Sequence, residues 1–98
     1  MRTSRKEILE KAAECVCTDR NLKYGEPENN FPVIADLWSA FLCAKTGKTV
    51  ILGTADVADM MILFKLGREI TGKGSVDSYI DIAGYAACAG SLIEVDNG

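Results

Sequence analysis

The feature that most constrains this sequence is the stretch from Val57 to Ile70, which is apolar on nearly every side when drawn as a helix. A helix with that pattern is stable in water only where other helices surround it. Because the chain has 98 residues, it has room for one core, and its other helices must supply the cover. The sequence therefore predicts a single all-α domain over residues 1–98.

Apolar residues at helical spacing, together with signals for helix ends, predict four helices in all. Ser4 and Glu7 have the spacing of a capping box, and Pro32 suits the first turn of a helix. Thr54 and Ser75 are typical N-cap residues. The predicted helices cover about residues 4–19, 32–45, 54–70 and 75–94.

The segment between the first two helices, residues 20–31, has no period and is rich in Gly, Pro and Asn, which predicts a loop. Loops of about 12 residues in a small domain are often functional. Arg20, Lys23 and Tyr24 lie in this segment and could close over an anionic ligand, with the tyrosine stacked on a base. The alternative is that Tyr24 only anchors the loop.

Composition narrows the class of partner. The formal net charge is −3, whereas a surface that follows nucleic-acid phosphates normally has a basic excess, so nucleic acid is disfavoured. No apolar stretch approaches the roughly 20 residues that span a bilayer, and the N-terminus lacks the apolar region of a signal peptide. The four cysteines form no C-x-x-C pair and histidine is absent, which favours buried free thiols. We expect a cytoplasmic protein with no membrane partner.

The last two predicted helices have more apolar surface than two short amphipathic helices can cover. The final helix is also rich in small residues, including Gly84 and Gly90, which let another helix backbone come close. Glycine inside a helix costs about 1 kcal/mol relative to alanine, so close packing is the expected compensation. We therefore expect a four-helix bundle-like domain that is completed by homo-oligomerisation.

Two pairs of aspartates lie in the last two helices. Asp56 and Asp59 are three residues apart, and Asp77 and Asp81 are four apart, so each pair shares a helix face. Asp56 and Asp77 are first-turn acids that complement the helix dipole. If the two helices pack antiparallel, the pairs lie toward opposite ends, unless a symmetry mate brings them together.

Asp59 and Asp81 stand among apolar residues, where we expect them to be buried. Buried acids must be paired, protonated or bound to a metal, so either ion pairs or a Mg²⁺ or ligand site is expected. Tyr85 shares its face with Asp77 and Asp81, and it is either a core tyrosine or a ligand contact. Cationic partners are available in Arg20, Lys23, Lys65 and Arg68.

A set of motifs in fixed order covers most of the chain: Arg20-x-x-x-Tyr24-Gly25, Asn30-Phe31, Leu37-Trp38, Asp56-Val57-Ala58-Asp59-Met60-Met61, Lys65-Leu66-Gly67-Arg68 and Asp77-x-x-x-Asp81-Ile82-Ala83-Gly84-Tyr85-Ala86. The set resembles a family of short phage and prophage proteins of unknown function. More distantly, it resembles the MazG-like all-α nucleoside triphosphate pyrophosphohydrolases. That second resemblance implies helical oligomers that hold Mg²⁺ between acidic residues of neighbouring helices and cleave between the α- and β-phosphates.

In the MazG-like pattern, the acid-x-x-Asp motif of the later metal-binding helix falls on Asp56 and Asp59. The Glu-Glu-x-x-Glu run of the preceding helix is missing, and only Asp36 stands there. Either the fourth helix rebuilds the metal site with Asp77 and Asp81, or the protein binds a nucleotide without cleaving it.

The sequence therefore supports two functional hypotheses. The first is a phage-type nucleotide-binding protein, with or without Mg²⁺-dependent pyrophosphohydrolysis. The second is a non-catalytic phage counter-defence protein that sequesters a nucleotide signal or blocks a host defence protein, acting in the host cytoplasm. A structural alternative leaves the aspartates in ion pairs only. In the first hypothesis the metal ligands are Asp56, Asp59, Asp77 and Asp81, and the ligand contacts are Arg20, Lys23, Tyr24, Lys65, Arg68 and Tyr85.

Overall fold

The computed structural model describes residues 2–19 and 27–97, with side chains described for 2–17 and 30–93. Helix α1 (Arg5–Glu14) continues into a short π-helix, η1 (Cys15–Asp19). It is followed by α3 (Pro27–Thr46), α4 (Thr54–Thr71) and α5 (Val76–Asn97). Within the described ranges the protein is thus all-α, with four α-helices and no strand, which confirms the predicted fold class.

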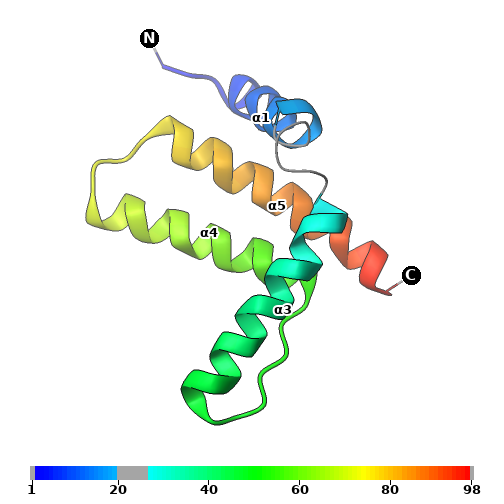
Figure 1. Ribbon diagram of the computed structural model, residues 1–98. Coiled ribbons are helices and arrows are strands. Elements are labelled where there is room, and N and C mark those ends of the chain that lie inside the picture. Colours follow the sequence, from blue (N-terminus) through cyan, green and yellow to red (C-terminus); the bar gives the residue numbers. More distant parts are fainter. Residues whose placement is uncertain (1, 20–26, 98) are drawn as a thin grey trace.

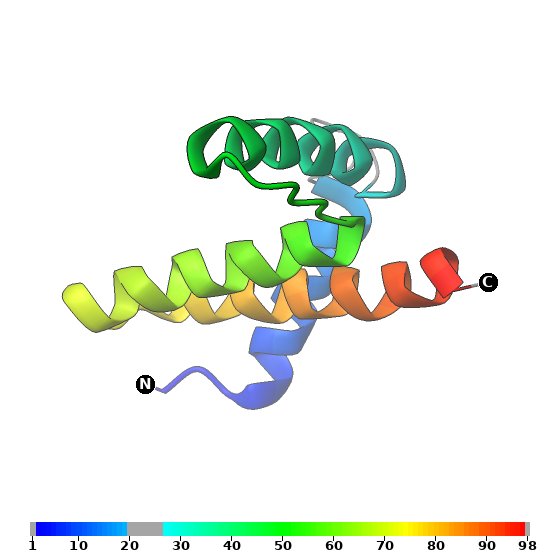
Figure 2. The same ribbon diagram turned by 90° about the horizontal axis from the view of Figure 1, so that it is seen from below.

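Helices α4 and α5 lie side by side as an antiparallel hairpin, joined by a turn at residues 72–75 (Figure 1). Helix α1 packs against α5 on the side away from α4. Helix α3 crosses α4 near the start of α4 and diverges from it (Figure 1). From below, α3 lies on one side of the hairpin (Figure 2). Among the described residues, large apolar side chains on both α3 and α4 stay exposed, including Leu37, Phe41 and Leu63.

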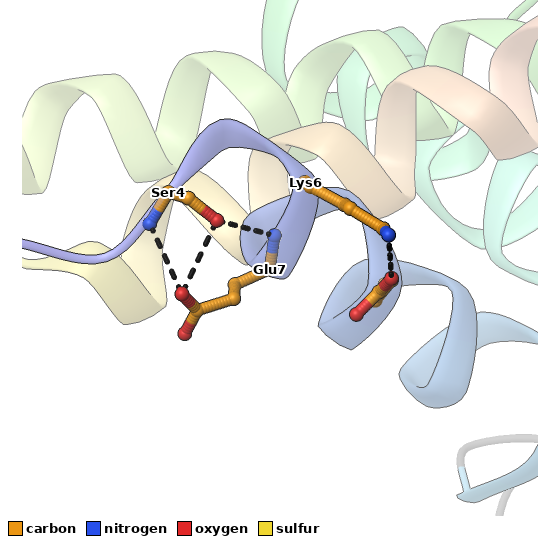
Figure 3. Close-up of polar contacts among 4 residues, drawn as sticks. Ser4, Lys6 and Glu7 are labelled. Carbon is orange, nitrogen blue, oxygen red and sulfur yellow. Dashed lines mark hydrogen bonds and ion pairs between the residues drawn. The ribbon is translucent and has the colours of Figure 1, made fainter.

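The predicted helix starts are largely present. The Ser4 hydroxyl oxygen accepts the Glu7 backbone N–H at 3.1 Å, and the Glu7 carboxylate accepts the Ser4 N–H at 3.5 Å (Figure 3). The Ser75 hydroxyl accepts the Ser78 N–H at 3.2 Å at the start of α5. The N-cap of α4, however, is Gly53 and not Thr54.

The predicted loop is wrong for residues 27–31, because α3 begins at Pro27. Pro27 fits a first helical turn as well as Pro32 does. Phe31 is only 7% exposed, and its burial in the core favours the longer helix. Pro32 then lies in the second turn, where it removes one backbone hydrogen bond. The rest of the predicted loop, residues 20–26, lies outside the described residues.

The connector between α3 and α4 is tied to α3 by side chains. Gly47 ends α3 in the left-handed region, at φ 69°. The Leu52 N–H donates to the Ser39 hydroxyl at 2.8 Å. The Val50 N–H donates to the Cys43 sulfur, and the Cys43 thiol donates to the Val50 carbonyl, both at 3.2 Å. These bonds fix the direction in which the chain enters α4.

The core lies where α3, α4 and α5 meet. Val57 and Ala58 of α4 are 1% and 0% exposed, and Leu92 of α5 is 1% exposed. Gly84 allows a close approach of η1 to α5, because a Cβ there would lie 2.9 Å from a methyl group of Val16. Core and packed residues are Phe31, Ala35, Val57, Ala58, Tyr85, Cys88, Ala89, Leu92, Val16, Ile34, Trp38, Leu52, Met61 and Ile62.

Two expectations about burial are wrong for the single chain. Helix α4 is not surrounded, because Leu63 and Phe64 are 66% and 53% exposed. Of the free cysteines, Cys88 is buried but Cys17 is exposed. No helix among the described residues is long and apolar enough to cross a membrane.

Candidate ligand pocket

A cavity of about 270 Å³ lies at the junction of α3, α4 and α5. Its walls are mostly apolar and aromatic, with an amide and a phenol as polar groups. Pockets of this composition are typical of small-molecule sites. The lining residues are Asn30, Phe31, Ile34, Trp38, Val57, Met61 and Tyr85.

Helical spacing explains why these side chains meet. On α3, Phe31, Ile34 and Trp38 recur every three to four residues, so they face the hairpin together. On α4, Val57 and Met61 are four residues apart and share one face. Tyr85 reaches the same place from α5 and is 6% exposed, so its ring forms part of the core.

Of the predicted ligand contacts that the structure describes, Tyr85 lines this pocket. Arg20, Lys23 and Tyr24 lie outside the described residues. The Lys65 ammonium contacts Asp81, and the Arg68 guanidinium lies 5.9 Å from the centre of the Phe64 ring. That last geometry is a cation–π contact on the outer side of α4.

Asp81 forms an ion pair across the seam between α4 and α5. Its carboxylate oxygen lies 2.9 Å from the Lys65 nitrogen, and the two side chains are 32% and 18% exposed. Water is partly excluded there, so the attraction is screened less than on an open surface. For Asp81, the structure thus contains the ion pair that the sequence left as one of two alternatives.

The other three predicted metal ligands are exposed. The Asp56 carboxylate accepts the Gly53 N–H at 2.7 Å and so helps to cap α4. Asp77 lies in the first turn of α5, where an acid complements the helix dipole. The expectation of burial is wrong for Asp59, which is exposed, and for Asp81, which is half-buried.

The hairpin places the two acid pairs toward opposite ends, as the antiparallel alternative predicts. Asp59 precedes Lys65, the partner of Asp81, by six residues, or about 9 Å along α4. Among the described residues, no three Asp, Glu, Cys or His side chains are grouped so that they could hold a metal ion. A magnesium site built from all four aspartates therefore stays a prediction that requires a second chain.

Sequence reasoning placed Phe31 in the predicted loop and Trp38 and Met61 in predicted helices, and it identified none of the three as a pocket wall. Aromatic and methionine residues at helical spacing give the same pattern whether they fill a core or line a cavity. The available signal was Asn30, a polar residue directly before that apolar stripe.

Comparisons with known proteins place most of this chain in one family. Residues 7–93 match the family described as "Domain of unknown function (DUF6378)". The chain is 40% identical over 88 residues to the Gene 55 protein of Mycobacterium phage D29, which covers 89% of this chain and 54% of that protein. It is 40% identical over 79 residues to the Gene 55 protein of Mycobacterium phage L5, covering 81% and 47%.

The chain thus spans about half the length of the curated relatives that it matches. No solved structure matches it. The comparisons support the resemblance to phage proteins of unknown function, but they do not support the more distant resemblance to the MazG-like enzymes.

Proposed function

The chain belongs to the DUF6378 family of unknown function, and on that premise we propose that it binds a nucleotide in the pocket lined by Phe31, Trp38 and Tyr85. The base would enter the cavity and the phosphates would stay at its mouth, in contact with solvent. The observation that carries the proposal is the grouping of three aromatic side chains, from α3 and α5, around one cavity. The proposed compartment is the cytoplasm, where nucleotides are abundant.

The chemistry of the walls suits a base. Every nucleobase has a π-face, and stacking on an aromatic side chain contributes about 1–3 kcal/mol per base. Asn30 and Tyr85 supply an amide and a hydroxyl beside those faces, which are the groups that select among base edges or ribose hydroxyls. The cavity, at about 270 Å³, is near the lower limit for small-molecule pockets, which suits a base with part of its sugar.

Two of the four predicted phosphate contacts have other partners in the described chain. Lys65 is engaged with Asp81, and Arg68 lies over Phe64. Arg20 and Lys23 keep their predicted role as phosphate contacts. Recognition in this proposal therefore depends first on the base and second on charge.

The positions of the aspartates favour nucleotide binding without cleavage. Mg²⁺ requires oxygen ligands at about 2.0–2.1 Å in near-octahedral geometry. The described aspartates of one chain do not gather in that way. A protein that sequesters a nucleotide signal would need only the pocket, so this form also covers that part of the counter-defence hypothesis.

The test uses Trp38, the only tryptophan in the chain and part of the pocket wall. Purified protein is titrated with purine and pyrimidine nucleoside mono- and triphosphates and with cyclic dinucleotides, with and without Mg²⁺. A bound base should quench the Trp38 fluorescence. At 100 times its dissociation constant, it should also add about 2.7 kcal/mol of stability. That gain raises the melting temperature by several degrees in a domain of this size.

A matched pair of tyrosine variants tests the location of binding. Tyr85→Phe should weaken binding by up to about tenfold, because one hydrogen bond contributes roughly 0.5–1.5 kcal/mol. Tyr79→Phe makes the same change on the same helix, at a residue that is 50% exposed and outside the pocket lining, and should leave affinity unchanged. If no nucleotide quenches the Trp38 fluorescence and none raises the melting temperature, the proposal is refuted.

A further inference from the structure

We propose that a second copy of this chain covers the outward side of α3 and α4. This α3–α4 face consists of exposed large apolar residues that recur at helical spacing on both helices. Leu37 and Phe41 on α3 are 65% and 64% exposed, and Leu63 on α4 is 66% exposed. The α3–α4 face comprises Val33, Leu37, Phe41, Met60, Leu63 and Phe64.

A hollow of about 360 Å³ lies between α3 and the α4 half of this face. Trp38 of α3 and Met60, Met61 and Phe64 of α4 line it, and its walls are almost entirely apolar. Apolar patches larger than a few hundred Å² are uncommon on monomeric proteins and mark interaction surfaces. The hollow gives an apolar side chain of a partner a place to insert, as the central anchors of protein interfaces do.

The total accessible surface of the chain is large enough for one protein interface to be covered. Its accessible surface is 7022 Å², whereas a compact monomer of 10.6 kDa is expected to expose about 5,500 Å². The excess is about 1,500 Å², and a stable interface buries roughly 800 Å² on each partner. The radius of gyration of 14.8 Å also exceeds the value of about 12.6 Å expected for a compact domain of 98 residues.

Charges at the edges of the face favour a protein partner over a membrane. On each helix the apolar strip lies between one acid and one base that are nine residues apart, and so on opposite sides of the helix. The pairs are Asp36 with Lys45 and Asp59 with Arg68. An apolar centre with a rim of both signs is typical of protein interfaces. A membrane-binding helix has a rim rich in lysine and arginine.

A second copy is the partner that fits these observations best. Closed twofold dimers are by far the commonest soluble assemblies, and they use the same patch on both subunits. Contact through the uncharged centre of the face lets two chains, each of net charge −3, associate without placing like charges against each other.

The dimer would also shape the candidate ligand pocket. Trp38 and Met61 line both the pocket and the hollow. Filling the hollow would therefore hold one wall of the pocket in place. This coupling rests on the proposed function, whereas the dimer does not.

The test is the mass of the protein in solution, measured by light scattering after size exclusion and by sedimentation. We expect twice the chain mass of 10.6 kDa. Phe41→Glu should shift the mass to that of one chain. Leu9→Glu is the matched control, because Leu9 is also 64% exposed but lies on α1, beyond α5 from α4 (Figure 1). It should leave the dimer intact.

Leu63→Glu on α4 provides a second, independent disruption, and circular dichroism checks that each variant keeps its helices. A wild-type chain that stays at the mass of one chain at submillimolar concentration would overturn the dimer. A dimer that survives both Phe41→Glu and Leu63→Glu would overturn the assignment to this face. Because mass and fluorescence are separate readouts, failure of the dimer and failure of nucleotide binding are distinguishable.

Discussion

Helix α4 has two apolar sides with different surroundings. On the inner side, Val57 and Ala58 are almost fully buried against α3 and α5. On the outer side, Leu63 and Phe64 are more than half exposed, although they are as hydrophobic as the buried residues. The energy of burying an apolar side chain, about 25 cal/mol per Å², is thus realised on one side only. The outer side keeps that energy available for association.

The largest expected effect compares two leucines. Leu92→Ala, at a residue 1% exposed, should destabilise the chain by about 3 kcal/mol, because it removes buried methyl groups and leaves a cavity. Leu63→Ala, at a residue 66% exposed, should change stability by less than about 0.5 kcal/mol. Both are measured by urea unfolding in the Phe41→Glu background, where association no longer contributes. Similar losses at both positions would show that Leu63 is covered within its own chain.

Two glycines of α5 extend the comparison to a second helix. Gly84→Ala would place a methyl group 2.9 Å from Val16 and should destabilise the chain by about 1 kcal/mol, because η1 has to shift. Gly90→Ala meets nothing within 4 Å and should stabilise the helix by up to about 1 kcal/mol. Thermal unfolding of both variants measures the difference. A gain at Gly84 as large as that at Gly90 would mean that η1 does not pack closely on α5.

Most of the fold was predictable because its signals are local. The Ser4–Glu7 capping box and the N-cap at Ser75 form as their spacing predicts, since a cap involves only one turn of chain. The start of α3 was not predictable to the same degree. Pro27 and Pro32 carry equal signals, and the choice between them depends on the tertiary burial of Phe31.

The site was less predictable than the fold because it depends on tertiary contacts and not on local signals. Hydrophobic periodicity indicates that a face needs cover, but it does not indicate whether the cover comes from the same chain. The pattern therefore places Trp38 in a helix but does not show that it lines both cavities. The sequence offered four cationic side chains as partners for Asp81 and did not select one. The pairing with Lys65 depends on the register between α4 and α5.

The smallest expected effect compares two ion pairs. Lys65–Asp81 lies in the seam of the hairpin, with side chains 18% and 32% exposed, whereas Lys6–Glu10 on α1 is 3.9 Å long, with side chains 85% and 60% exposed. Double-mutant cycles with Asp81→Asn and Lys65→Met should give a coupling of about 1 kcal/mol, against less than about 0.5 kcal/mol for Glu10→Gln and Lys6→Met.

The seam pair should also keep most of its coupling in 1 M salt, because partly buried charges are screened less than exposed ones. Urea unfolding at low and high ionic strength measures both cycles. If the two pairs have equal coupling energies and 1 M salt abolishes both, the seam between α4 and α5 is open to water. The inner side of α4 would then not be closed to water at the Lys65–Asp81 pair.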